Sequence, residues 1–312
     1  MDFELCQNIK ENIGRVIVGK EWAVELLLTA VLAEGHIMIE DVPGLGKTLL
    51  AKSLARSMGG TFKRVQFTPD LLPADITGFS IYNQKNGEFT FQPGPVMANV
   101  LLADEINRTI PRTQASLLES MEERQVTVDG QTYPLPIPFL VLATQNPIEL
   151  EGTFPLPEAQ LDRFLLKIKL GYPNHDEEMA IMARFQENNP LENLSAVTEP
   201  ARITGMQRDC RRIHVSNAVR GYISELVQTT RRHPAIRYGA SPRGSLGLMR
   251  AAQSLAALQG RTYVLPDDVK RIVEPVLSHR LILKDEERLR GESPERFIKE
   301  IVDQVAPPVT NN

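Results

Sequence analysis

The chain has 312 residues, a net charge of −4 and two cysteines, so it is long enough for two domains and shows no general attraction to nucleic acid. Cys6 and Cys210 lack the paired spacing that a zinc site or a disulfide framework would need, which indicates a reducing compartment. No apolar run is long enough to cross a bilayer, and we expect a cytoplasmic protein without a transmembrane segment.

The first part of the chain alternates short apolar runs with helical segments. The runs are nearly continuous in apolar residues, which is typical of strands buried on both faces of a parallel sheet. Helices are predicted at 47–60 and 113–123. We therefore expect residues 1–172 to form a three-layer αβα domain around a five-stranded parallel sheet. The five runs lie at 36–41, 62–67, 99–104, 138–145 and 164–170.

Two segments interrupt this alternation, near 79–92 and 124–136. Each contains a dipeptide that favours a hairpin turn, Asn86-Gly87 in the first and Asp129-Gly130 in the second. Neither hairpin is needed to complete a parallel sheet. They are either surface additions or projecting loops that grip another molecule.

Beyond residue 172 the pattern becomes helical. Amphipathic helices are predicted at 176–186, 217–232, 243–260 and 267–281, and we expect no further strand. Residues 173–312 should therefore form a C-terminal helical lid domain.

The turn after the first apolar run resembles a phosphate-binding loop. The motif requires Gly, four free positions and then Gly-Lys-Ser/Thr, but Asp41 replaces the first glycine. A strand before the loop and a helix after it would direct backbone N–H groups and the helix dipole at an anion. Lys47 should reach the β- and γ-phosphates of ATP or ADP, and the Thr48 hydroxyl should bind Mg²⁺. The predicted nucleotide-contacting residues are Pro43, Gly44, Leu45, Gly46, Lys47, Thr48 and Leu49.

An acidic pair, Asp104 and Glu105, ends the third apolar run. A carboxylate at the carboxyl end of a buried strand is suited to Mg²⁺ opposite Thr48. Glu105 could accept a proton from the attacking water as general base. Two acids after an apolar run are common by chance, and the phosphate loop makes this pair specific.

Three polar residues complete the candidate site. Asn146 follows the fourth run and could orient the water or contact the γ-phosphate. Arg163 precedes the fifth run, where it is either an ordinary ion-pair partner or an arginine finger for a neighbouring subunit. Arg243 lies in the first turn of a helix capped by Ser241, against the helix dipole. We expect the helical domain to bring Arg243 over the bound nucleotide.

These segments, in this order, resemble the AAA+ ATPases and, within them, the MoxR family. The similar stretches are "EDVPGLGKTLLAKSLA", "VLLADEINR", "LATQNPIELEGTFPLPEAQLDRF" and "YGASPRG". The resemblance runs from about residue 10 to 290. It implies that the first two stretches are the Walker A and Walker B motifs. It also implies that the two hairpins are the helix-2 insert and the presensor-1 hairpin of that clade.

The resemblance also implies individual roles. Asn146 would be sensor 1, Arg163 an arginine finger acting in trans, and Arg243 sensor 2. Val18 and Gly19 would contact the adenine. Members of the family form hexameric rings and are thought to be chaperone-like remodelling ATPases, often with von Willebrand factor A domain partners.

Two other classes of function are alternatives to a ring ATPase that remodels protein clients. A nucleic-acid motor would need more basic hairpins, because Lys85 is the only lysine of the first hairpin and Arg124 the only arginine of the second. A nucleotide-gated scaffold without turnover would need neither Glu105 nor Arg163.

Overall fold

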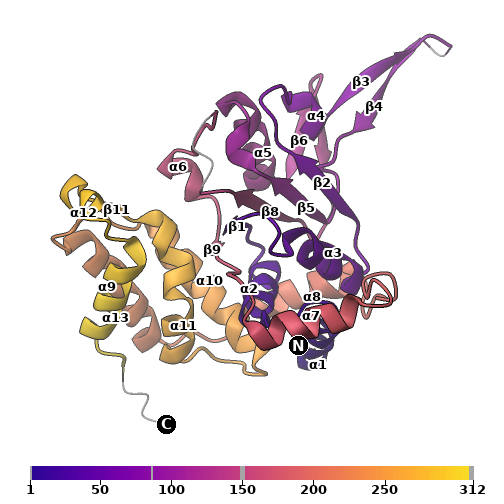
Figure 1. Cartoon of the computed structure of the whole chain (residues 1–312). Helices are drawn as coiled ribbons and strands as arrows, with labels where there is room; N and C mark the ends of the chain where they lie inside the picture. The colour runs from indigo at the N-terminus through magenta and orange to yellow at the C-terminus, as the bar shows by residue number, and fades with distance from the viewer. Residues whose placement is uncertain (1, 86, 148–151, 309–312) are drawn as a thin grey trace.

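The computed structural model describes residues 2–85, 87–147 and 152–308. Its centre is a parallel sheet of five strands in the order β2-β5-β8-β1-β9 (Figure 1). The five predicted runs are these strands, so the predicted parallel sheet is confirmed. The strands are β1 (Ile37–Glu40), β2 (Phe62–Gln66), β5 (Val100–Asp104), β8 (Leu140–Gln145) and β9 (Leu166–Ile168).

Side chains alternate between the two faces of the sheet, and each face has its own hydrophobic cluster. Ile37 and Ile39 of β1 point into the cluster that contains α1, α2 and α3, whereas Met38 points into the cluster that contains α5. Helices therefore cover both faces, as expected for a three-layer domain. Their bounds are α1 (Phe3–Gly14), α2 (Glu21–Leu32), α3 (Lys47–Ser57), α4 (Pro73–Thr77), α5 (Pro111–Glu123) and α6 (Glu158–Leu161).

Strand β2 differs from the prediction of a strand buried on both faces. It lies at the edge of the sheet, and Lys63, Arg64 and Gln66 are exposed. An edge strand has a neighbour on one side only, so polar side chains there do not interrupt the core. These polar residues become important at the functional site.

Both predicted hairpins are present. The first pairs β3 (Gly78–Asn83) with β4 (Glu88–Pro93), and Figure 1 shows it projecting away from the sheet. Asn86 of its predicted turn lies outside the described residues. The second pairs β6 (Gln125–Val128) with β7 (Gln131–Pro134), and its turn residues Asp129 and Gly130 have φ values of 50° and 78°. Positive φ at both positions is what the Asp-Gly pair predicted.

The C-terminal part is mainly helical, but the expectation of no further strand was wrong. Two short strands, β10 (Ile236–Tyr238) and β11 (Ile282–Leu283), form an antiparallel pair. Strands of three and two residues are too short to produce a periodic pattern. The helices are α7 (His175–Phe185), α8 (Pro200–Cys210), α9 (Asn217–Arg232), α10 (Pro242–Leu258), α11 (Pro266–Leu277), α12 (Asp285–Leu289) and α13 (Pro294–Gln304).

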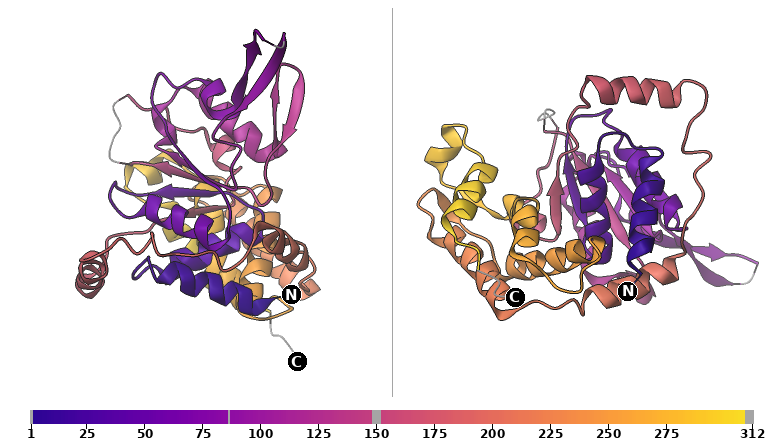
Figure 2. Two further views of the ribbon diagram at one scale, coloured as in Figure 1. Left: turned by 90° about the vertical axis from the view of Figure 1, so that its right-hand side faces the viewer. Right: turned by 90° about the horizontal axis from the view of Figure 1, so that it is seen from below.

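Most of these helices are not a separate unit packed loosely on the sheet domain. Buried residues of α8, α10 and α11 belong to the same hydrophobic cluster as those of α1, α2 and α3. Helix α7 has no buried residue and lies apart from α9–α13 in both views of Figure 2. The short helix α12 also has no buried residue.

Candidate functional site

The predicted phosphate loop connects β1 to α3. Gly44 and Gly46 have φ values of 88° and 83°, in the left-handed region that glycine adopts without strain. Helix α3 then begins at Lys47, and its buried residues Leu50 and Leu54 hold it against the sheet. The unpaired N–H groups of the first helical turn and the positive end of the helix dipole therefore face the loop.

Asp41 does not obstruct this loop. Its carboxylate accepts a hydrogen bond from the backbone N–H of Gly171 at 3.0 Å, just beyond β9. Its carbonyl oxygen accepts one from Lys47 Nζ at 2.7 Å. Burial lowers the pKa of Lys47, while the nearby charges of Asp104, Asp41 and Glu105 act in the opposite direction. The side chain that replaces the usual glycine therefore points toward the end of β9.

Asp104 and Glu105 lie at the carboxyl end of β5, held by Thr144 of the neighbouring strand β8. The Thr144 hydroxyl donates to Asp104 Oδ1 at 2.6 Å and accepts from the Glu105 backbone N–H at 2.8 Å. Glu105 has a φ of 57°, which is uncommon for a residue other than glycine and is concentrated at functional sites. A strained backbone thus directs the Glu105 side chain.

Two residues of β2 also contact this acidic pair, and the sequence reasoning missed both. Arg64 Nη2 lies 2.6 Å from Asp104 Oδ2, and the Gln66 side-chain amide donates to Glu105 Oε2 at 2.8 Å. Both belong to β2, which pairs directly with β5 and places Gln66 opposite Asp104. The signal in the sequence was their spacing of two residues, which puts both side chains on one face of an edge strand.

Asn146 follows β8 and is 6% exposed. Strands β1, β5 and β8 are parallel neighbours, so Lys47, Asp104, Glu105 and Asn146 all follow carboxyl ends at one edge of the sheet. In open parallel sheets, ligands bind outside this edge.

The residues present fit Mg²⁺. The Thr48 hydroxyl and the Asp104 carboxylate are hard oxygen donors. Among the described residues no group of three or more His, Cys, Asp or Glu side chains could hold a metal. The usual Mg²⁺ site uses one or two protein oxygens together with water and substrate phosphates.

Val18 and Gly19 lie in the turn between α1 and α2, beneath α7. A Cβ atom at Gly19 would lie 2.1 Å from Glu177 Cδ, so the Glu177 side chain of this helix lies directly against the turn. Arg184 of α7 also donates to the Gly14 carbonyl at 2.7 Å. Helix α7 therefore covers the turn predicted to contact adenine.

Arg163 lies at the amino ends of the parallel strands, whereas Lys47 lies at their carboxyl ends. It precedes β9, whose Leu166 pairs with Ile37 at the amino end of β1, and the Leu165 N–H donates to the His36 carbonyl at 2.8 Å. The phosphate loop follows the carboxyl end of the same strand β1. A four-residue strand rises about 13 Å at the usual 3.3 Å per residue, so the two groups are separated along the sheet.

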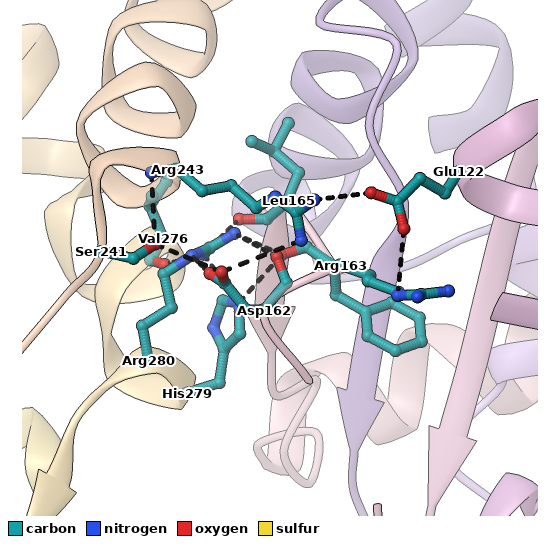
Figure 3. Close-up of polar contacts among 10 residues, drawn as sticks. Glu122, Asp162, Arg163, Leu165, Ser241, Arg243, Val276, His279 and Arg280 are labelled. Atoms are coloured by element: carbon teal, nitrogen blue, oxygen red, sulfur yellow. Dashed lines mark hydrogen bonds and ion pairs between the residues drawn. The ribbon is translucent and has the colours of Figure 1, made fainter. Parts of the chain in front are cut away.

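Arg243 lies beside Arg163 rather than over the phosphate loop. Both arginines form an ion pair with Glu122 of α5, Arg243 at 2.6 Å and Arg163 at 3.2 Å (Figure 3). The Ser241 hydroxyl accepts from the Arg243 N–H at 3.2 Å, as expected of an N-cap. The structure therefore brings Arg163 and Arg243 together and keeps both apart from the phosphate loop of their own chain.

Arg280 fixes the backbone that carries Arg163. Its guanidinium is buried and donates to Asp162 Oδ1 at 2.8 Å and to the Phe164 carbonyl at 2.6 Å (Figure 3). The His279 ring lies 3.0 Å from the same carbonyl. The segment of Arg163 is thereby tied to the helical part that also carries Arg243.

The two arginines line a cavity of about 360 Å³ between α10 and the start of β1. Its wall carries six arginines against three carboxylates, which makes it suited to an anion. The arginines are Arg124, Arg163, Arg211, Arg243, Arg250 and Arg280, and the acids are Glu34, Glu122 and Asp162.

Two parts of the chain match models of known protein families. Residues 36–166 match the family model described as the ATPase family associated with various cellular activities (AAA), and residues 228–301 match the AAA lid domain. No helix among the described residues has the length and apolar character to cross a membrane.

Similar proteins cover nearly the whole chain. Uncharacterized protein YeaC of Bacillus subtilis is 50% identical over 96% of this chain and 93% of its own. Chaperone MoxR1 of Mycobacterium tuberculosis is 45% identical over 96% of this chain and 81% of its own. A crystal structure of a Cytophaga hutchinsonii protein superimposes with a TM-score of 0.92 at 41% identity, covering 98% of this chain and 96% of that one. The chain belongs to the MoxR family of AAA+ ATPases.

Proposed function

We propose that the protein hydrolyses Mg-ATP as a ring of identical subunits, in which each nucleotide lies between two chains. The observation that carries this proposal is the position of Lys47 and Arg163 at opposite edges of one sheet. A nucleotide in the phosphate loop is out of reach of Arg163 of its own chain. A ring, hexameric in this proposal, would bring Arg163 of one subunit to the loop of the next.

In this arrangement each subunit contributes to two sites, one that binds its own nucleotide and one that binds its neighbour's. Lys47 and the N–H groups at the start of α3 hold the β- and γ-phosphates, while Asn146 positions the attacking water. Glu105 accepts a proton from that water. The water oxygen attacks the γ-phosphorus, and the bond between this phosphorus and the bridging oxygen of ADP breaks. Thr48 and Asp104 would hold Mg²⁺, which would supply positive charge to neutralise the β- and γ-phosphates. Arg163 and Arg243 of the neighbour stabilise the charge on the transferred group.

Protein clients fit the projecting hairpins better than nucleic acid does. Phe79, Ile81, Tyr82 and Phe89 of the β3–β4 hairpin are large apolar or aromatic side chains that are 47–72% exposed. An exposed apolar surface favours a protein partner, whereas a nucleic-acid track requires a positive groove. We propose client remodelling in the reducing cytoplasm, with a von Willebrand factor A domain protein as one candidate partner. The name of the relative MoxR1 includes the word chaperone.

The proposal is tested by following phosphate release and sedimentation on the same samples. Mg-ATP should convert the protein to a ring and support hydrolysis, and chelation of Mg²⁺ should stop the hydrolysis. Full activity of a dilute monomer would contradict the shared site. Strong activation by single-stranded DNA or RNA would favour the nucleic-acid motor, and ring formation without turnover would favour a nucleotide-gated scaffold.

A further inference from the structure

The carboxylate of Glu122 lies between two arginines that come from distant parts of the chain. Its Oε1 accepts from Arg243 Nη2 at 2.6 Å, and its Oε2 lies 3.2 Å from Arg163 Nε (Figure 3). Each carboxylate oxygen of Glu122 thus contacts one of the two guanidinium groups. This is the bridging position that an oxygen-rich anion such as phosphate would take.

One carboxylate cannot neutralise two guanidiniums. The other nearby acid, Asp162, is 3.9 Å from Arg243 but only 2.8 Å from Arg280, and it pairs with that buried guanidinium. Arg250 lines the same cavity, and no ion pair involves it among the described residues. The cavity therefore keeps surplus positive charge with Glu122 in place, and a phosphate group with more than one negative charge can compete with that side chain.

Glu122 is not needed to hold the two arginine backbones. Arg280 fixes the segment of Arg163 through the carbonyls of Phe164 and Leu165, the latter at 3.2 Å. Ser241 caps the helix that begins beside Arg243. Loss of Glu122 would free two side chains without moving either backbone.

We propose that Glu122 is a positioning residue that occupies Arg163 and Arg243 in the free subunit and releases them to the phosphates of a neighbouring subunit's nucleotide. The inference rests on the proposed function, because it requires the arginines to act across a subunit interface. Glu122 must be displaced or shifted before both guanidiniums can contact phosphate. The carboxylate also repels the incoming phosphate.

Replacing Glu122 with Gln should therefore strengthen ATP-dependent association. Gln keeps the shape of the side chain but removes its charge and one of its acceptors. Half-exposed ion pairs of this kind change an equilibrium constant by up to roughly fivefold each. We expect the protein concentration at half-association in saturating Mg-ATP to fall by about fivefold, with no change when nucleotide is absent.

The measurement is sedimentation of full-length protein in the Glu105→Gln background, so that bound ATP persists. Glu123→Gln is the matched control, because Glu123 is the next residue of α5, is exposed, and forms no ion pair among the described residues. Glu122→Ala gives a second variant, and binding of a fluorescent ATP analogue confirms that each variant is folded. In an Arg243→Ala background the effect of Glu122→Gln should be clearly smaller.

Unchanged or weaker association of both Glu122 variants in Mg-ATP would overturn the inference. An equal gain in the Arg243→Ala background would also overturn it, since Glu122 would then act through another contact. If Mg-ATP does not promote association even with Glu122 intact, the shared site itself fails, and the proposed function fails with it.

Discussion

Lys47 and Arg163 lie at opposite ends of the same parallel sheet, Lys47 beyond the carboxyl end of β1 and Arg163 before the amino end of β9. Both strands run in the same direction and are direct neighbours. The strand between them is buried and packed, so it keeps the two groups apart along the sheet. In the proposed ring, complementary halves on separate chains would account for the presence of both residues.

Lys47→Ala should abolish nucleotide binding. The ammonium group is the main side-chain charge directed at the β- and γ-phosphates, and backbone N–H groups alone form a weaker site. Lys52→Ala is the matched control, because Lys52 lies on the same helix but is exposed over the ring of Phe62. Binding of a fluorescent ATP analogue checks this. Equal binding by the parent and the Lys47 variant would contradict the phosphate-loop assignment.

Glu105→Gln should bind Mg-ATP almost normally but hydrolyse it roughly 10²–10⁴-fold more slowly, because an amide cannot accept the proton of the water. Binding and single-turnover hydrolysis are measured on the same sample. Glu286→Gln, on the exposed face of α12, is the control. Equal losses of binding and turnover would point to a structural acid and place the base elsewhere. The slow variant is also the one with which to capture a client.

The β6–β7 hairpin should be dispensable for folding and ATP binding but required for work on a client. Val126 and Tyr133 are register partners, so replacing residues 127–132 with Asn-Gly closes the shortened hairpin with a favourable turn. Tyr133 is kept because it stacks on Phe91 of the other hairpin, with ring centroids 4.0 Å apart. An insoluble product, or one that no longer binds ATP, would show that the hairpin is part of the core.

Stability should fall as the pH drops below about 6.5, because two histidines are buried in the neutral form. Burial, helped by the charge of Arg124, lowers the pKa of His36 to about 3, and burial beside Arg280 lowers the pKa of His279 well below its ordinary value. The unfolded chain binds these protons near pH 6.5 and the native chain does not. Each group therefore costs up to about 1.4 kcal/mol of unfolding free energy per pH unit below that point.

Urea unfolding at pH 7.5 and 5.0 measures this loss. His36 accepts from the Val141 N–H at 3.0 Å and lies 3.2 Å from the Met121 carbonyl. His36→Gln should lower stability at pH 7.5 but reduce the further loss at pH 5.0. His175→Gln, at an exposed position of α7, should leave the pH dependence unchanged. A pH dependence that is the same in His36→Gln as in the parent would contradict this account.

The carboxyl edge of the sheet was predictable because its residues follow apolar runs directly. Strand, loop and helix occur in sequence around Lys47, and the apolar strand before Asp104 fixes where its side chain emerges. Residues 1–172 and 173–312 remain the predicted division into domains. The short β10–β11 pair and the exposed side chains of β2 could not be read from periodicity, because a two-residue strand has no period and an edge strand need not be apolar.

The cluster of charged residues at the amino ends of the strands was harder to predict, because its contacts join segments far apart in sequence. Nothing local indicates that Glu122 bridges Arg163 and Arg243, or that Arg280 is buried against residues 162–165. Such contacts depend on how the helical part packs, which the pattern of a single helix does not determine. For the same reason Arg243 was expected over the nucleotide of its own chain, whereas it lies beside Arg163.

The central claim is that Arg163 completes the site of a neighbouring subunit. Arg163→Ala should bind ATP, because its own Lys47 and Thr48 are untouched, and should lose hydrolysis by about 10³-fold or more. Glu105→Gln is also inactive alone. In a mixed ring, Arg163 of the Glu105→Gln subunit faces an intact Glu105 on the Arg163→Ala subunit.

The most direct test is to titrate these two inactive variants against each other at fixed total protein while following phosphate release. Co-sedimentation of labelled subunits first establishes that the two variants exchange into common rings. The account predicts that turnover reappears in the mixtures and is greatest near equal amounts. Confirmed exchange with no recovery of activity at any ratio would contradict it.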